Sequence, residues 1–93
     1  RNHSSAASDV YKRQAMMALT VGVEEEVGHM FGDMIATGQG IGTSDLGACW
    51  DAIYDTHTEV LQHLIVEAGL TLTTIYDMMY AEIDRLETWH AVA

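Results

Sequence analysis

Three stretches of the chain repeat hydrophobic residues at the 3.6-residue period of an α-helix, and this pattern restricts the fold more than any other feature. We predict helices over about residues 15–37, 45–68 and 73–91. The first turn between them contains the glycine-rich run 38–44, and Gly69 ends the second helix before Thr71 or Thr73 caps the third. Amphipathic helices with such short connections favour an all-α fold of antiparallel helical hairpins that form a bundle.

The hydrophobic stripes define the expected core. In the three helices in turn, we expect burial of Met16, Leu19, Val23, Val27, Met30 and Met34; of Leu46, Trp50, Ile53, His57, Val60, Leu61 and Leu64; and of Ile75, Met78, Met79, Ile83, Leu86 and Trp89. Gly22, Gly28 and Gly32 lower the helix propensity of the first stretch, so we expect another helix to approach it closely there. Because so short a chain buries a small core, we expect a homo-oligomer, in which a second subunit completes the bundle, or else a missing upstream helix.

The first 14 residues differ from the rest of the chain. They contain Arg1, Lys12 and Arg13, which are three of its four basic residues, and they have no helical hydrophobic stripe. The run 4–14 resembles translated adapter sequence, so we expect residues 1–14 to be a non-native leader. A disordered natural arm is the alternative. Residues 15–93 then form a single helical domain.

The chain is strongly acidic, with 14 acidic and 4 basic residues and a formal net charge of −10. Arg85 is the one lysine or arginine after residue 14, so we expect no binding to nucleic acid. No hydrophobic run is long enough to span a bilayer, and we expect no membrane partner. The single cysteine, Cys49, fits a reducing compartment, which predicts a cytoplasmic protein.

Acidic residues and histidine recur at helical spacing on the first two helices. Glu26 and His29 are three residues apart and Asp51 and Asp55 are four apart, so each pair shares a helix face. Counted from the turn near Ile41, the two pairs lie at similar heights on neighbouring helices. Inward-facing side chains of this kind form the metal sites of helical bundles. The alternative is that the two aspartates form a solvated face, since they lie opposite the main hydrophobic stripe of their helix.

A second pair of polar residues interrupts the hydrophobic stripes. His57 lies 13 residues before the turn near Leu70 and Glu82 lies 12 residues after it. The two therefore lie at similar heights, and we expect them to pair inside the bundle.

These motifs resemble the all-α nucleoside triphosphate pyrophosphohydrolases, the MazG-like and phosphoribosyl-ATP pyrophosphohydrolase-like family. Its members pair an EExxE helix with a helix that carries ExxD or a DxxxD variant. Here the motifs read EEVGH (25–29) and DAIYD (51–55), and the run 67–86 is similar to the segment that follows the second acidic helix in the family. The chain departs from the pattern at His29, where the family has a third glutamate, and at Ala52, where it has the glutamate of ExxD.

The resemblance implies an enzyme that cleaves a nucleoside triphosphate to a monophosphate and pyrophosphate. It implies Glu26, His29, Asp51 and Asp55 as ligands of Mg²⁺, and the imidazole shifts the preference towards Mn²⁺. The metal would lower the pKa of an attacking water, which Glu25 would orient or deprotonate.

Two other functions fit the same sequence. The first is a non-enzymatic acidic helical oligomer from a halophilic source, whose charge reflects its habitat. The second is a ferritin-like metal-binding bundle that uses Glu26, His29, His57, Glu59, His63 and Glu82.

Overall fold

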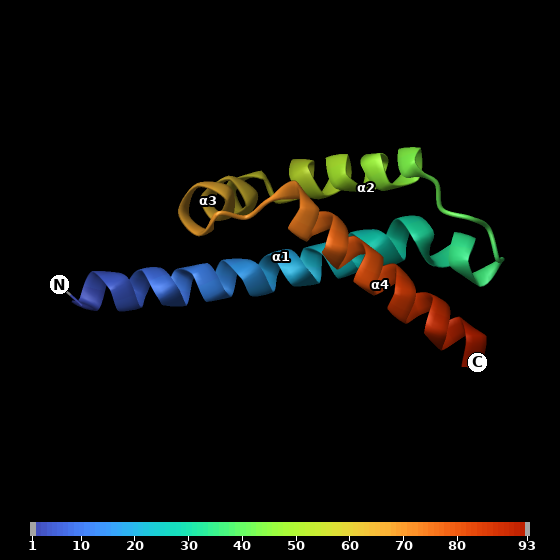
Figure 1. Ribbon diagram of the computed structural model, residues 1–93, viewed down its shortest axis with the longest axis horizontal. Helices are drawn as coiled ribbons and strands as arrows, with labels where there is room; N and C mark the ends of the chain where they lie inside the picture. The colour runs from blue at the N-terminus through green and yellow to red at the C-terminus, as the bar shows by residue number, and fades with distance from the viewer. Residues whose placement is uncertain (1, 93) are drawn as a thin grey trace.

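The computed structural model describes the backbone of residues 2–92 and the side chains of residues 8–92. Within this range all regular secondary structure is helical: α1 (Asn2–Ala36), α2 (Thr43–Thr56), α3 (Thr58–Ala68) and α4 (Leu72–Val92). The long helix α1 runs along the longest axis of a molecule that measures 54 × 26 × 18 Å, and α4 crosses it at an angle (Figure 1). The predicted all-α fold with packed helices is confirmed.

The N-terminal part of α1 differs from the expectation of a leader outside the fold. Residues 2–14 continue the helix without a break. Alanine, lysine, arginine and glutamine in this segment are good helix formers, and extending an existing helix costs much less than nucleating a new one. The ring of Tyr11 also packs edge-on against His63 of α3, with 4.2 Å between the ring centroids. That the segment is foreign to the natural protein stays a prediction.

The buried side of α1 winds around the helix, because its buried residues recur every four positions. Each such step exceeds one helical turn by about 40°. The helix therefore turns successive sides towards its three partner helices, and the buried series is Ala15, Leu19, Val23, Val27, Phe31 and Ile35. The predicted straight stripe missed Phe31 and Ile35. It also included Met16, Met30 and Met34, which are only partly buried.

The predicted second helix, 45–68, is broken at His57 into α2 and α3. The amide of His57 donates to the carbonyl of Ile53 at 2.9 Å, and the carbonyl of His57 accepts from the amide of Leu61 at 2.9 Å, so one helix ends where the next begins. The hydroxyl of Thr58 donates to the carbonyl of Tyr54 at 2.5 Å. A threonine bond of this kind satisfies a carbonyl that the break would otherwise leave free, and it favours a bend.

The break places His57 directly on α1. A Cβ atom added to Gly22 would lie 2.3 Å from Nε2 of His57, which is closer than two such atoms can approach. The expected close approach is therefore confirmed at Gly22. It is wrong for Gly28 and Gly32, where an added Cβ would meet no atom within 4 Å.

The predicted helix end at Gly69 and the predicted cap of the helix that follows it are confirmed. Gly69 adopts the left-handed conformation (φ 69°) and the amide of Leu70 donates to the carbonyl of Leu64, as in a glycine-terminated helix. The hydroxyl of Thr71 accepts from the amide of Thr74 at 3.3 Å and so caps α4.

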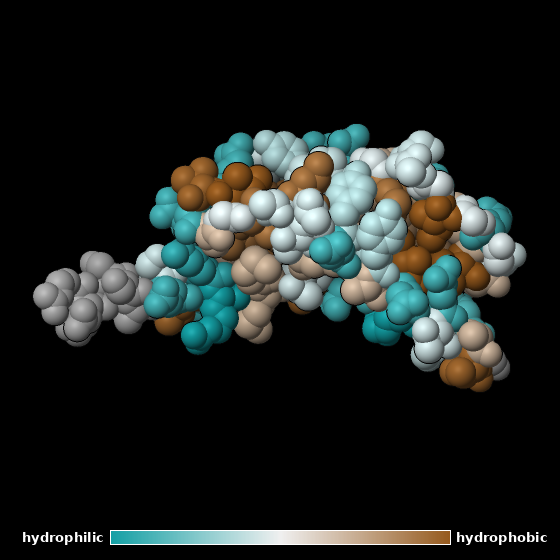
Figure 2. Space-filling model, in the orientation of Figure 1, coloured by the Kyte–Doolittle hydropathy of each residue, from teal (hydrophilic) through white to brown (hydrophobic). Residues whose placement is uncertain are grey.

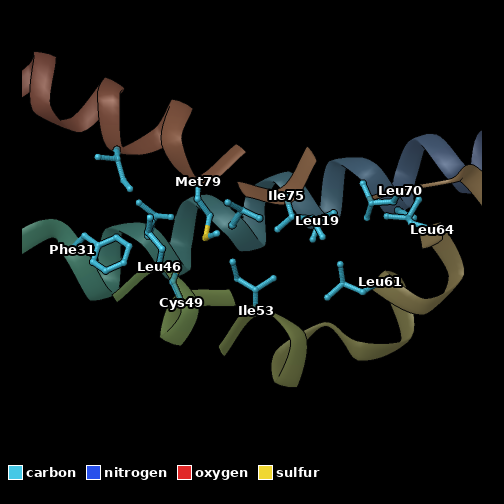
Figure 3. Packing of buried hydrophobic residues seen from close by; sticks show 14 of the residues in the cluster. Leu19, Phe31, Leu46, Cys49, Ile53, Leu61, Leu64, Leu70, Ile75 and Met79 are labelled. Carbon is cyan, nitrogen blue, oxygen red and sulfur yellow. The ribbon is translucent and has the colours of Figure 1, made fainter. Parts of the chain in front are cut away.

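One hydrophobic core joins all four helices. Leu46, Cys49 and Ile53 project from α2 towards Ile75 and Met79 of α4, across the middle of α1 (Figure 3). Beside the break, Leu61 and Leu64 of α3 close the core next to Leu19 of α1 and Leu70, which precedes α4 (Figure 3).

We expect Gly22→Ala to lower the free energy of unfolding by about 1–3 kcal/mol, because the new methyl group overlaps the imidazole of His57. The measurement is urea denaturation followed by circular dichroism. Gly32→Ala is the matched control, since it should raise stability by up to about 1 kcal/mol in open space on the same helix. In a His57→Ala background the penalty of Gly22→Ala should vanish. Equal stability of the two single variants would refute the close contact.

Candidate functional site

The two aspartates of the predicted metal site lie on the outer face of α2. Cys49 and Ile53 of this helix are fully buried, and residues two positions apart on a helix point in directions about 200° apart. Asp51 and Asp55 are accordingly exposed. Their environment matches the solvated face that the sequence left open as the alternative.

The predicted ligands on α1 divide between two sides of that helix. Glu26 is half-buried and lies close enough to Cys49 for its charge to raise the pKa of the thiol, so it faces α2. Glu25 and His29 are exposed and line a groove between α1 and α4, opposite Glu82 and Arg85.

The fold therefore does not bring the five predicted site residues together. Among the residues whose side chains are described, no three histidine, cysteine, aspartate or glutamate side chains converge closely enough to hold a metal ion. The residues of the ferritin-like alternative are also dispersed: His57 packs on Gly22, His63 contacts Tyr11, and Glu82 binds Arg85. The Mg²⁺ or Mn²⁺ site stays a prediction without support from the geometry of one chain.

The buried charge in this region is Glu82, and its partner is Arg85. Two parallel hydrogen bonds join them, from Nε to Oε1 at 2.7 Å and from Nη2 to Oε2 at 2.6 Å. These bonds to Glu82, together with the negative charges of Glu82 and Glu24, raise the pKa of the Arg85 guanidinium. Glu82 is only 6% exposed, so the pairing compensates the burial of its charge.

This finding corrects the expected pairing of Glu82 with His57. The signal for the observed pair was present in the sequence, because Glu82 and Arg85 are three residues apart on one helix and side chains at this spacing are neighbours. His57 is instead positioned by its contact with Gly22.

His63, which the ferritin-like alternative uses as a metal ligand, has an unsatisfied polar atom. Its Nε2 atom is buried and has no hydrogen-bond partner among the described residues. The ring is in edge-type contact with the ring of Tyr11, so this residue of α1 covers part of it.

Cys49 is fully buried in the core, and among the described side chains no cation contributes to its pKa. Removal from solvent, followed by the charge of Glu26, raises the pKa of the thiol to about 11. A thiol with this pKa is almost entirely protonated at neutral pH and is a poor nucleophile.

No protein-family model, curated protein or solved structure matches this chain. None of the described helices is both long enough and hydrophobic enough to cross a membrane. The resemblance to the MazG-like family therefore stays a prediction, based on the two acidic motifs.

We expect the Cys49 thiol to react with an aromatic disulfide reagent at pH 8 at least about 100-fold more slowly in the folded chain than in concentrated guanidinium. The pKa of about 11 leaves about 100-fold less thiolate than the ordinary value of 9.0, and burial blocks access further. The release of the chromophore measures the rate, with Cys49→Ser as the blank. Equal rates in the two states would show that the thiol is accessible.

Proposed function

We propose that this chain is an acidic helical assembly module that associates with a second copy of itself along the α1–α4 groove. The observation that supports the proposal is that the side of α4 that faces the core becomes exposed towards the C-terminal end of the helix. Ile75, Met79 and Glu82 on this stripe are buried, but Trp89, which follows on the same side, is 59% exposed. In Figure 2, hydrophobic atoms remain uncovered at the projecting C-terminal end of the helix.

The groove beside this stripe is shallow and open to solvent. Val21 and Gly28 of α1 line it together with Leu86 of α4, and Trp89 lies one turn further along the same side. Gly28 presents no side chain there, and a Cβ added to it would touch nothing. A hydrophobic helix face next to an uncovered glycine allows close helix–helix packing.

The groove also contains charges of both signs. Glu24 and Glu25 line it together with Arg85, whose guanidinium is largely exposed, and His29 lies beside them. In a symmetric dimer the same surface of each copy meets the other, so the Arg85 of one copy can approach the carboxylates of its partner.

The net charge of −10 opposes this association at low ionic strength. Added salt shortens the screening distance from about 10 Å at 0.1 M to about 3 Å at 1 M. We therefore expect salt to strengthen self-association, which agrees with the proposal that the protein comes from a salt-rich habitat.

We expect the mass measured by sedimentation equilibrium to rise from about one chain in dilute buffer towards two chains in molar salt, because screening removes the repulsion. The rise should be insensitive to a chelator. Trp89→Ser should abolish it by removing the exposed anchor, whereas the matched control Val66→Ser, at an exposed position on α3, should not. A single-chain mass at all salt concentrations, or equal effects of both substitutions, would refute the proposal.

Nucleotide hydrolysis is the second candidate, and one observation favours it. Glu26 is half-buried on the side of α1 that faces α2, so one of the carboxylates that the resemblance implies as metal ligands already points towards the helix that carries the DAIYD motif. Asp51 and Asp55 would have to join it by rotation of α2 about its axis, or be supplied by a second copy.

The test is release of pyrophosphate from a panel of nucleoside triphosphates with Mg²⁺ or Mn²⁺. If the candidate is right, at least one nucleotide is hydrolysed and Asp55→Asn abolishes the release, because a metal ligand is lost. Glu67→Gln, a charge removal on the surface of α3, should leave the rate unchanged. Failure to hydrolyse any member of the panel with either metal would exclude this function.

A further inference from the structure

A second surface of α4 shares no residue with the self-association groove. It contains a strip of hydrophobic and aromatic residues at helical spacing, Leu72, Tyr76 and Tyr80, which we call the tyrosine strip; the buried Ile83 lies at the base of its second hollow. Leu72 is 50% and Tyr80 is 52% exposed. Two shallow hollows along the strip have Tyr80 and Asp77 in common, so the surface is continuous over about 16 Å of helix.

One edge of the tyrosine strip is acidic. Asp77, Asp84 and Glu87 line the hollows and are all exposed. Among the described side chains, Glu82 and Arg85 form an ion pair, and both residues lie in the α1–α4 groove. The three carboxylates at this edge therefore remain without a counter-charge from their own chain within the described part of the molecule.

The tyrosine strip of a second copy is a poor occupant for this surface. The strip and its edge carry no lysine or arginine, since Lys12 and Arg13 lie on α1 and Arg85 lies in the α1–α4 groove. Two tyrosine strips facing each other would place acid against acid in a water-poor interface, which is unfavourable. The surface instead complements a partner whose hydrophobic face is bordered by cations.

We propose that the tyrosine strip binds a basic amphipathic helix of another protein. Asp77 and Asp84 are seven residues apart, which is about 10.5 Å along the helix, so lysines or arginines seven residues apart on the incoming helix face both. Leucine-type side chains between these cations pack on Leu72, Tyr76 and Tyr80, as in other complexes where an amphipathic helix docks on a hydrophobic surface. The tyrosine rings offer further attraction to the cations.

The test is titration of the full chain with a synthetic amphipathic helical peptide that has leucine on one face and lysine at seven-residue spacing, followed by calorimetry. We expect saturable binding of one peptide per chain. Tyr80→Ala should weaken it by at least about tenfold, because it removes the exposed centre of the strip, and Asp77→Asn/Asp84→Asn should do the same by removing the facing charges. Both variants change exposed residues, and circular dichroism verifies that they fold.

Two controls separate docking from general attraction between opposite charges. Glu59→Gln/Glu67→Gln removes two exposed charges from α3 and should change the affinity by less than about twofold. A peptide of the same composition in scrambled order should not saturate the chain. No binding of the designed peptide, equal weakening by the α3 control, or equal binding of the scrambled peptide would each overturn the proposal. A loss of self-association in Tyr80→Ala would also overturn it, because the strip would then be a contact between copies.

Discussion

The contact between Gly22 and the imidazole of His57 is the constraint on which the arrangement of the helices depends. It is possible only because one helix lacks a side chain at the point where the other breaks. With the break at this point, α2 lies along one part of α1 and α3 turns away from the line of α2 (Figure 1). The threonine hydroxyl that binds the carbonyl of Tyr54 stabilises the same bend from within the chain.

Charge is the second constraint. Arg85 is bound to Glu82, so a single cation compensates the carboxylate that is buried among the described side chains, and the other acids there are exposed or partly buried. The two proposed interaction surfaces differ for this reason. The α1–α4 groove includes Arg85 and is compatible with a second copy, whereas the edge of the tyrosine strip is purely acidic and requires a basic partner.

The predicted metal site shows how far periodicity determines a site. Helical spacing correctly indicated that Asp51 and Asp55 share a face, but the direction of that face depends on what α2 buries. Because Cys49 and Ile53 enter the core, the aspartates point to solvent. The same argument applies on α1, where neighbouring residues in one motif differ by about 100° in direction, so Glu25 and Glu26 face different helices.

The sequence by itself determined the helical class, the turn at Gly69, the cap at Thr71 and most of the core, because these follow from local backbone preferences and from hydrophobic periodicity within one segment. It also contained the signal for the Glu82–Arg85 pair, because two residues three positions apart on one helix are neighbours whatever the fold. Only the tertiary structure decided the break at His57, the winding of the buried side of α1 and the direction of each acidic face. These features depend on contacts between segments distant in the chain, and no local pattern specifies which side of a helix its neighbour will cover.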